Sequence, residues 1–181
     1  LQFANKKISV IGFDQDIQKL SLLKKDISPI SYIKSSEIKK IRSFTSYETD
    51  YSKIDKCDAI ILCLPTPLKN KKPDLSHIIE TMVKIEKYLK KNQFLVLEST
   101  TYPGTTEEKI KPFIEKKFSL GVDFFLGYSP ERENPGDKRF SFNRIPKICS
   151  GYSLKCTKLC LSLYKTIVHK VVPAKNIKEA E

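Results

Sequence analysis

The sequence is poor in the residue types that build metal sites and membrane spans. It has two histidines and five cysteines, none of them in a Cys-x-x-Cys pair, so a zinc site has little to draw on. No apolar run approaches the roughly 20 residues that a membrane helix needs. We expect the odd number of cysteines to be buried, reduced thiols of a cytoplasmic protein: Cys57, Cys63, Cys149, Cys156 and Cys160.

Glycine is scarce as well, with six residues in 181. None of them forms the Gly-x-Gly-x-x-Gly turn that cradles a dinucleotide pyrophosphate. The chain starts with neither an initiator Met nor a signal-peptide layout, and we expect it to begin partway through an element.

Positive charge, in contrast, is abundant: 33 basic and 21 acidic residues give a net charge of +12. A nucleic-acid site would concentrate this charge and interleave it with aromatic residues. Here the lysines are spread along most of the chain in short pairs. The pattern favours a solvated, lysine-rich surface that attracts anionic small molecules, and we expect no nucleic-acid or membrane partner.

Buried apolar segments alternate with amphipathic ones from end to end, which is typical of a parallel α/β sheet with helices on both faces. The expected strands are 8–14, a short one near 43–45, 58–64, 94–98, 122–126 and 166–172. The expected helices are 15–24, 74–89, about 106–117 and 153–164, with a further helix start at 176–181.

Three polar loops stiffened by proline follow three of the expected strands. They are 64–68, 98–106 and 127–137. Because ligands of open α/β sheets bind outside the carboxyl ends of the strands, these loops predict a binding crevice along one edge. The alternative for each loop is an ordinary solvated turn.

Two positions allow two interpretations. Asp14 ends its strand where an acid of a dinucleotide-binding fold holds the ribose, but it can also cap the following helix. The helix start after Gly104 suits an anion or a carbonyl oxygen, and it equally suits capping by Thr105 or Thr106 with support from Glu108.

Taken together, the motifs resemble the UDP-glucose/GDP-mannose dehydrogenase family. The matching pieces are Val10-Ile11-Gly12-Phe13-Asp14 with Lys19, Leu64-Pro65-Thr66-Pro67, Glu98-Ser99-Thr100, Pro103-Gly104-Thr105-Thr106, Tyr128-Ser129-Pro130-Glu131-Arg132, Asn134-Pro135-Gly136, Ile145-Pro146-Lys147, Ser150-Gly151 and Glu179-Ala180-Glu181. The form of the 128–137 stretch resembles the branch that oxidises UDP-N-acetylglucosamine or a related N-acetylhexosamine.

The resemblance implies a Rossmann-like fold that lacks its first strand and Gly-rich turn. Residues 1–175 would form part of an NAD-binding domain, and 176–181 would start a central linking helix. The implied reaction uses NAD to oxidise the C6 alcohol of a UDP-sugar to a uronic acid for surface polysaccharide synthesis. Complete relatives would be homo-oligomers.

The resemblance also implies roles for six residues. Asp14, Lys19, Thr66 and Thr100 would contact NAD, Thr100 and Glu131 would be catalytic, and Glu131 and Arg132 would contact the substrate. No metal is implied.

The chain departs from the family pattern at catalytic positions, and these departures leave other hypotheses about its function open. The family's catalytic Lys and Asn would follow Glu181, and none of the five cysteines occupies the position of its nucleophile. We therefore expect the 181 residues alone to be inactive. The rival hypotheses are a non-catalytic remnant of such an enzyme and an anion- or RNA-binding module.

Overall fold

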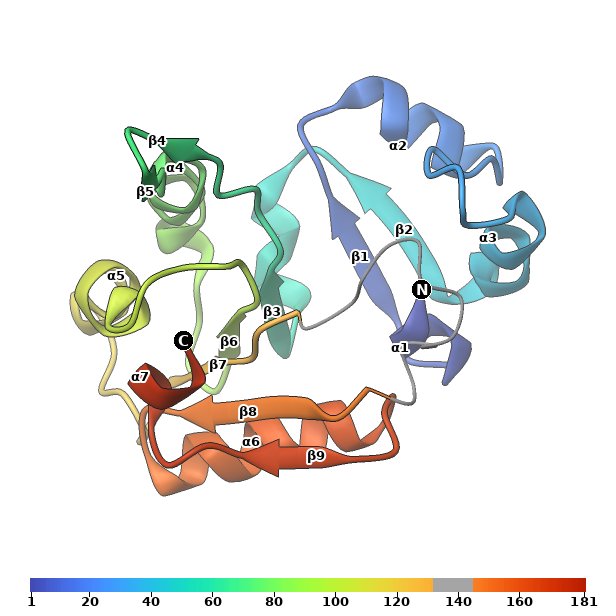
Figure 1. Ribbon diagram of the computed structural model, residues 1–181. Coiled ribbons are helices and arrows are strands. Elements are labelled where there is room, and N and C mark those ends of the chain that lie inside the picture. Colours follow the sequence, from blue (N-terminus) through green and yellow to red (C-terminus); the bar gives the residue numbers. More distant parts are fainter. Residues whose placement is uncertain (132–144) are drawn as a thin grey trace. The chain divides into compact units, whose positions relative to one another are not determined.

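The computed structural model describes residues 1–131 and 145–181, and the chain divides into two units, Leu1–Tyr51 and Ser52–Glu181 (Figure 1). Each unit is described by itself below.

The first unit is built around a parallel pair of strands, β1 and β2, in which Val10 pairs with Thr45 and Phe13 with Glu48. Its elements are α1 (Gln2–Asn5), β1 (Val10–Phe13), α2 (Ile17–Lys24), α3 (Ser35–Ile41), the 3₁₀ helix η1 (Arg42–Phe44) and β2 (Thr45–Glu48). The expected strand near 43–45 therefore begins two residues later and runs further.

The residue that caps α2 is Asp16. Its carboxylate accepts hydrogen bonds from the backbone N–H groups of Gln18 and Lys19, which are unpaired at a helix start. Asp14 accepts instead from the N–H of Asp16 at 2.9 Å. The capping alternative for Asp14 is thus wrong, and the helix begins two residues later than predicted.

The second unit contains a five-stranded sheet in the order β3-β6-β7-β8-β9. The 3₁₀ helix η2 (Tyr51–Lys56) leads into this unit, whose elements are β3 (Ala59–Leu62), β4 (Leu68–Lys69), β5 (Lys72–Pro73), α4 (Ser76–Ile85), η3 (Glu86–Tyr88), β6 (Phe94–Leu97), the π-helix η4 (Thr106–Ile110), α5 (Lys111–Glu115), β7 (Phe125–Tyr128), β8 (Lys147–Gly151), α6 (Leu154–Lys165), β9 (Val171–Pro173) and α7 (Ile177–Ala180).

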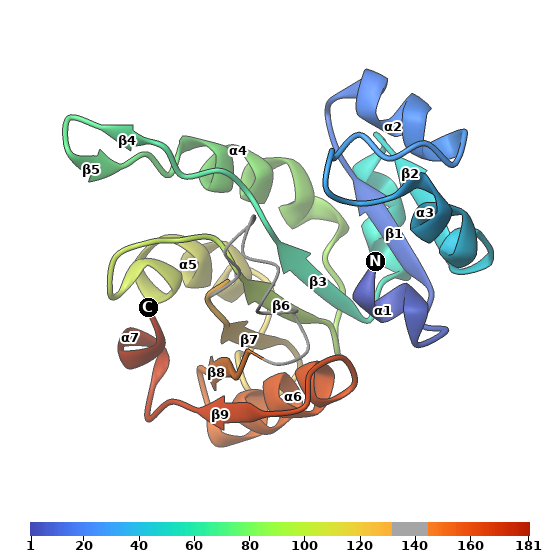
Figure 2. The same ribbon diagram turned by 45° about the vertical axis from the view of Figure 1, so that its right-hand side comes forward.

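Most strand pairs in this sheet are parallel, which confirms the α/β class. The pairs β3·β6, β6·β7 and β8·β9 are parallel, and β7·β8 is antiparallel. No strand was expected at Lys147–Gly151. In Figure 2, α4 and α5 lie on one side of β6 and β7, and α6 lies on the other.

The core of the second unit forms where the central strands meet these helices. Every residue of β6 and β7 is buried, as a strand covered on both faces requires. Helix α4 contributes Ile78, Met82 and Ile85, whose spacing of four and three residues places them on one face. Strand β7 starts three residues later than predicted, and Val122 is exposed.

The charged segment 69–73 is the end of a β-hairpin. Leu68–Lys69 pairs with Lys72–Pro73. Asn70 and Lys71 between them both have positive φ, at 52° and 63°, which is the conformation of a two-residue hairpin turn with the twist of its strands.

The β1–β2 sheet and the five-stranded sheet share no strand within residues 1–131 and 145–181. In the usual Rossmann order, the first strand lies between the strands that correspond to β1 and β3. The separate sheets agree with the prediction that this strand is not among the described residues. None of the helices in the described part is long and apolar enough to cross a bilayer.

Candidate functional site

The loops that follow β3, β6 and β7 meet at the carboxyl end of these strands. The Thr66 hydroxyl donates to the Thr100 carbonyl at 2.7 Å. The backbone N–H of Leu64 donates to the Ser99 hydroxyl at 2.9 Å, and the Tyr128 hydroxyl donates to the Ser99 carbonyl at 3.2 Å. Thr66 and Thr100 are therefore neighbours, and Ser99 joins the loops after β3 and β6 to the last residue of β7. We call this edge the rim.

A cluster of charged side chains lies at the same rim. The ammonium of Lys147, whose side chain is 4% exposed, lies 2.9 Å from Glu98 Oε1 and 2.9 Å from Glu131 Oε2. Glu98 follows β6, Glu131 follows β7, and Lys147 is the first residue of β8. The structure thus gives Glu131 two charged neighbours, Glu98 and Lys147, that the sequence analysis did not assign to the site.

Glu98 has further partners within the unit. Tyr164 of α6 donates its hydroxyl to Glu98 Oε1 at 2.6 Å, and the Cys63 thiol donates to Oε2 at 3.0 Å. Burial raises the pKa of Tyr164 well above its ordinary value, and the nearby Glu98 charge acts in the same direction. The Glu98 carboxylate is thereby held from two sides.

Cys63 departs from the expectation of buried cysteines. All five cysteines are free, and Cys149, Cys156 and Cys160 are buried, but Cys63 is exposed as a residue and Cys57 is half-buried. Desolvation of the Cys63 sulfur and the charge of Glu98 nevertheless raise its pKa far above the ordinary value. Because the thiolate is the nucleophile, Cys63 is a poor candidate for one.

Glu131 is the most accessible member of the charged cluster, with a side chain that is 38% exposed, against 14% for Glu98. It can therefore reach a bound molecule while its carboxylate stays paired with Lys147. Arg132, the other predicted substrate residue, lies outside the described residues.

The predicted ribose-binding residues lie in the first unit. Asp14 directly follows β1 and is exposed. Lys19 forms its ion pair with Asp16 at 3.7 Å, and both side chains are largely exposed, so the pair contributes little to stability. The roles of Asp14 and Lys19 in binding stay predictions.

The helix start after Gly104 is occupied by a side chain of the chain itself. The Glu181 carboxylate accepts from the backbone N–H of Gly104, from the N–H of Thr106 at 2.8 Å and from the Thr106 hydroxyl at 2.6 Å. The Thr105 hydroxyl donates to the Tyr102 carbonyl and makes no cap. The capping alternative with Thr105, Thr106 and Glu108 is therefore wrong, and the anion at this helix start comes from 75 residues away.

We expect Glu181→Ala to lower the free energy of unfolding by about 2–3 kcal/mol, because two N–H groups and a hydroxyl lose a charged acceptor. Glu181→Gln, which keeps one acceptor oxygen, should cost only about 1 kcal/mol. Urea unfolding monitored by circular dichroism measures both.

Lys178→Ala, at an exposed position on α7, the helix that ends just before Glu181, is the matched control and should be nearly neutral. If Glu181→Ala lowers the free energy of unfolding by less than about 0.5 kcal/mol, the Glu181 carboxylate does not stabilise the helix start after Gly104.

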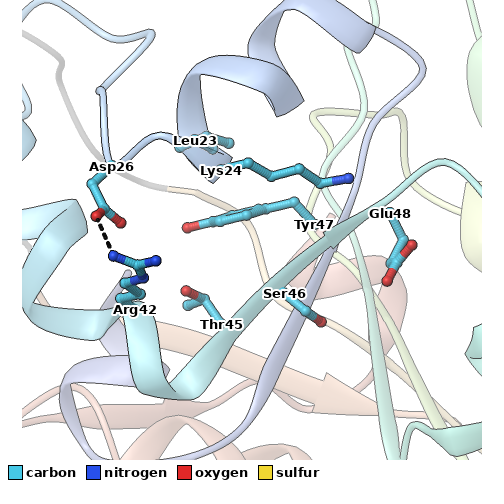
Figure 3. A pocket seen from close by; sticks show the side chains of 8 residues that line it. All are labelled: Leu23, Lys24, Asp26, Arg42, Thr45, Ser46, Tyr47 and Glu48. Atoms are coloured by element: carbon cyan, nitrogen blue, oxygen red, sulfur yellow. Dashed lines mark hydrogen bonds and ion pairs between the residues drawn. The ribbon is translucent and has the colours of Figure 1, made fainter.

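Two hollows are formed by other described residues. One, of about 290 Å³, is in the first unit between α2 and β2 (Figure 3), where Arg42 pairs with Asp26 at 3.1 Å and Lys24 extends beside the Tyr47 ring. The other, of about 500 Å³, is lined by the β4–β5 hairpin and Tyr102. Neither contains a predicted site residue.

Comparison with known proteins places this arrangement in a family. Residues 1–168 match the model of the UDP-glucose/GDP-mannose dehydrogenase family, NAD binding domain. The chain is 38% identical over 183 aligned positions to UDP-N-acetyl-D-glucosamine 6-dehydrogenase of Pseudomonas aeruginosa, covering 97% of this chain and 42% of that enzyme. The chain thus spans less than half the length of this relative.

Comparison with solved structures also finds sugar-nucleotide dehydrogenases of similar fold. NDP-N-acetyl-D-galactosaminuronic acid dehydrogenase of Methanosarcina mazei superposes with a TM-score of 0.86 at 30% identity, covering 95% of this chain and 39% of that one. UDP-D-ManNAc dehydrogenase of Pyrococcus horikoshii superposes with a TM-score of 0.91 at 23% identity, covering 99% and 44%, which shows the shared fold. The chain belongs to the UDP-glucose/GDP-mannose dehydrogenase family and carries its NAD binding domain.

Proposed function

We propose that this chain is the NAD-binding part of an enzyme that oxidises the C6 alcohol of a UDP-N-acetylhexosamine to the uronic acid, with UDP-N-acetylglucosamine as the substrate. The uronic acid product would be used in surface polysaccharide synthesis. The observation on which the proposal rests is the rim, where Thr66, Thr100 and Glu131 follow three neighbouring strands of one sheet. The 38% identical relative from Pseudomonas aeruginosa supports the choice of sugar.

The side chains that would hold NAD fit its chemistry. Asp14 is an exposed carboxylate at the carboxyl end of a parallel strand, and one of its oxygens accepts a hydrogen bond from the backbone N–H of Asp16. An ionised carboxylate has about four acceptor sites, so a ribose diol can still donate to it. When bound, NAD supplies the acceptor for the hydride that leaves the sugar alcohol.

The residues of the rim would do the remaining work. The Thr66 hydroxyl holds the Thr100 carbonyl, which orders the backbone beside the predicted catalytic position. Thr100 is exposed and would place an alcohol or a water molecule with its own hydroxyl. Glu131 would accept the proton that an alcohol or a water molecule gives up as it reacts. Conversion of an alcohol to a carboxylate removes four electrons, so two NAD molecules are reduced in turn.

The test compares this chain with a hybrid enzyme. In the hybrid, the chain replaces the matching region of the Pseudomonas aeruginosa relative, which supplies the remaining length. We expect the hybrid to reduce NAD in the presence of UDP-N-acetylglucosamine, followed at 340 nm, and the 181-residue chain alone to give no turnover.

Two results would contradict the proposal. One is a folded hybrid that reduces no NAD with any UDP-sugar. The other is a chain that binds RNA in a gel shift persisting above moderate salt, because purely electrostatic binding falls steeply with salt and persistence would indicate a nucleic-acid site.

A further inference from the structure

Lys147 is buried, which is rare for a lysine unless its charge is paired. Its ammonium is shared between two carboxylates, Glu98 and Glu131, at 2.9 Å each. The Tyr164 ring lies 5.1 Å from the same ammonium, which adds a favourable cation–π contact. Desolvating an ammonium is costly, and the contacts with these partners offset that cost.

The antiparallel pairing of β7 and β8 places Lys147 at the rim. Gly127 pairs with Gly151 and Tyr128 with Ser150. Extending this register by three residues sets Glu131 opposite Lys147, and the bond from the Ser129 hydroxyl to the Ile148 carbonyl, at 2.7 Å, agrees with the extension. Directly opposed residues of an antiparallel pair have neighbouring side chains. The ion pair is therefore a product of strand register.

The two carboxylates differ in how they are held. Glu98 is fixed by Tyr164 and Cys63 and is 14% exposed, whereas Glu131 is 38% exposed. Lys147 thus has one half-buried partner that anchors it and one accessible partner that it can orient. This asymmetry is what a positioning residue requires, since the group that meets the substrate must be held from behind.

The charge state of Lys147 is suited to this role. Burial alone lowers the pKa of Lys147, but the carboxylates of Glu98 and Glu131 outweigh it and raise that pKa above its ordinary value. Among the described residues, other titratable groups near it include Tyr164, Cys63, Cys149, Cys160 and Tyr128. A lysine whose pKa is raised stays an ammonium at neutral pH, and the stability it contributes is lost only as the pH rises above about 10.5.

We propose that Lys147 is a positioning residue that holds the Glu131 carboxylate at the rim, in the orientation in which it meets the reacting alcohol or water. This inference rests on the proposed function, because it concerns how Glu131 is presented for that chemistry. Lys147 acts only through Glu131 and does not touch the substrate.

The first experiment tests the geometry in the 181-residue chain and needs no activity. In ¹⁵N,¹³C-labelled chain, we expect the Lys147 Nζ resonance to show couplings across its hydrogen bonds to the carboxylate carbons of both Glu98 and Glu131. In Glu131→Gln, the coupling to Glu98 should remain. A Lys147 ammonium coupled to Glu98 alone, or one in fast exchange with water, would overturn the proposal.

The second experiment measures kinetics in the hybrid enzyme. We expect Lys147→Met to lower kcat on the order of 10²-fold, while KM for NAD and for the UDP-sugar changes less than about threefold. Lys147→Arg, which keeps a charged donor, should recover kcat to within about tenfold of the wild type. The matched control, Lys170→Met, replaces an exposed lysine and should leave kcat unchanged.

The double variant Lys147→Met/Glu131→Gln separates positioning from folding. If Lys147 acts through Glu131, the double variant should lose no more kcat than Glu131→Gln alone. Losses that multiply, or a kcat loss in Lys147→Met that equals its loss of folded protein by circular dichroism, would show a merely structural lysine. An inactive wild-type hybrid would contradict the proposed function, and the couplings of Lys147 would then decide the positioning proposal independently.

Discussion

Gly151→Ala is expected to destabilise the second unit by at least about 3 kcal/mol, one of the largest effects of a single methyl group in this chain. A Cβ atom at this position would lie 2.4 Å from the carbonyl carbon of Cys156 and 2.4 Å from the backbone nitrogen of Thr157. These atoms belong to the first turns of α6, so no side chain can rotate away to make room. Either α6 or the end of β8 must move.

The measurement is thermal unfolding followed by circular dichroism. A loss of this size corresponds to a fall in Tm of roughly 6–12 °C. Gly12→Ala is the matched control, because its Cβ would meet the Tyr47 side chain at 3.2 Å, and a ring can shift by a few tenths of an ångström. Equal Tm values for the two variants would show that α6 is not tightly packed against Gly151.

The second large effect is expected in catalysis. In the hybrid enzyme, Glu131→Gln should lower kcat by about 10²–10⁴-fold, the contribution of a well-placed acid or base. Glutamine keeps the size and an acceptor oxygen for Lys147, but it cannot take up a proton. KM for NAD should change little, because the expected contacts of the cofactor are made by other residues.

Glu115→Gln is the control for this variant. Glu115 is a partly exposed carboxylate on α5 that pairs with Lys111 at 3.5 Å and belongs to none of the three loops that form the rim. A Glu131→Gln hybrid whose kcat stays within about threefold of the wild type would remove Glu131 from the chemistry and leave the family assignment intact.

The position of the strand ends followed from local pattern. The apolar segments 58–64 and 94–98 predicted β3 and β6 because strands covered on both faces need continuous apolar side chains. Since parallel strands end at one edge, their loops had to meet, and the bond between Thr66 and Thr100 lies where this argument placed it.

The sequence did not identify the side chain that caps α2 or the carboxylate that binds at the helix start after Gly104. Several side chains near a helix start can accept the same N–H groups, and the sequence does not rank them. At α2 these N–H groups donate to the carboxylate of Asp16 and not to that of Asp14. At Thr106 a distant residue, Glu181, took the position that local residues were expected to fill.

By itself the sequence determined the α/β class, the order of most elements and the family resemblance, and that resemblance predicted Glu131 as a catalytic residue. Only the tertiary structure decided that β8 runs antiparallel to β7, and with it that Lys147 lies between Glu98 and Glu131. The physical reason is that periodicity along the chain reports which faces are buried, whereas an ion pair across strands depends on direction and register. Those are set by how strands distant in sequence pack together.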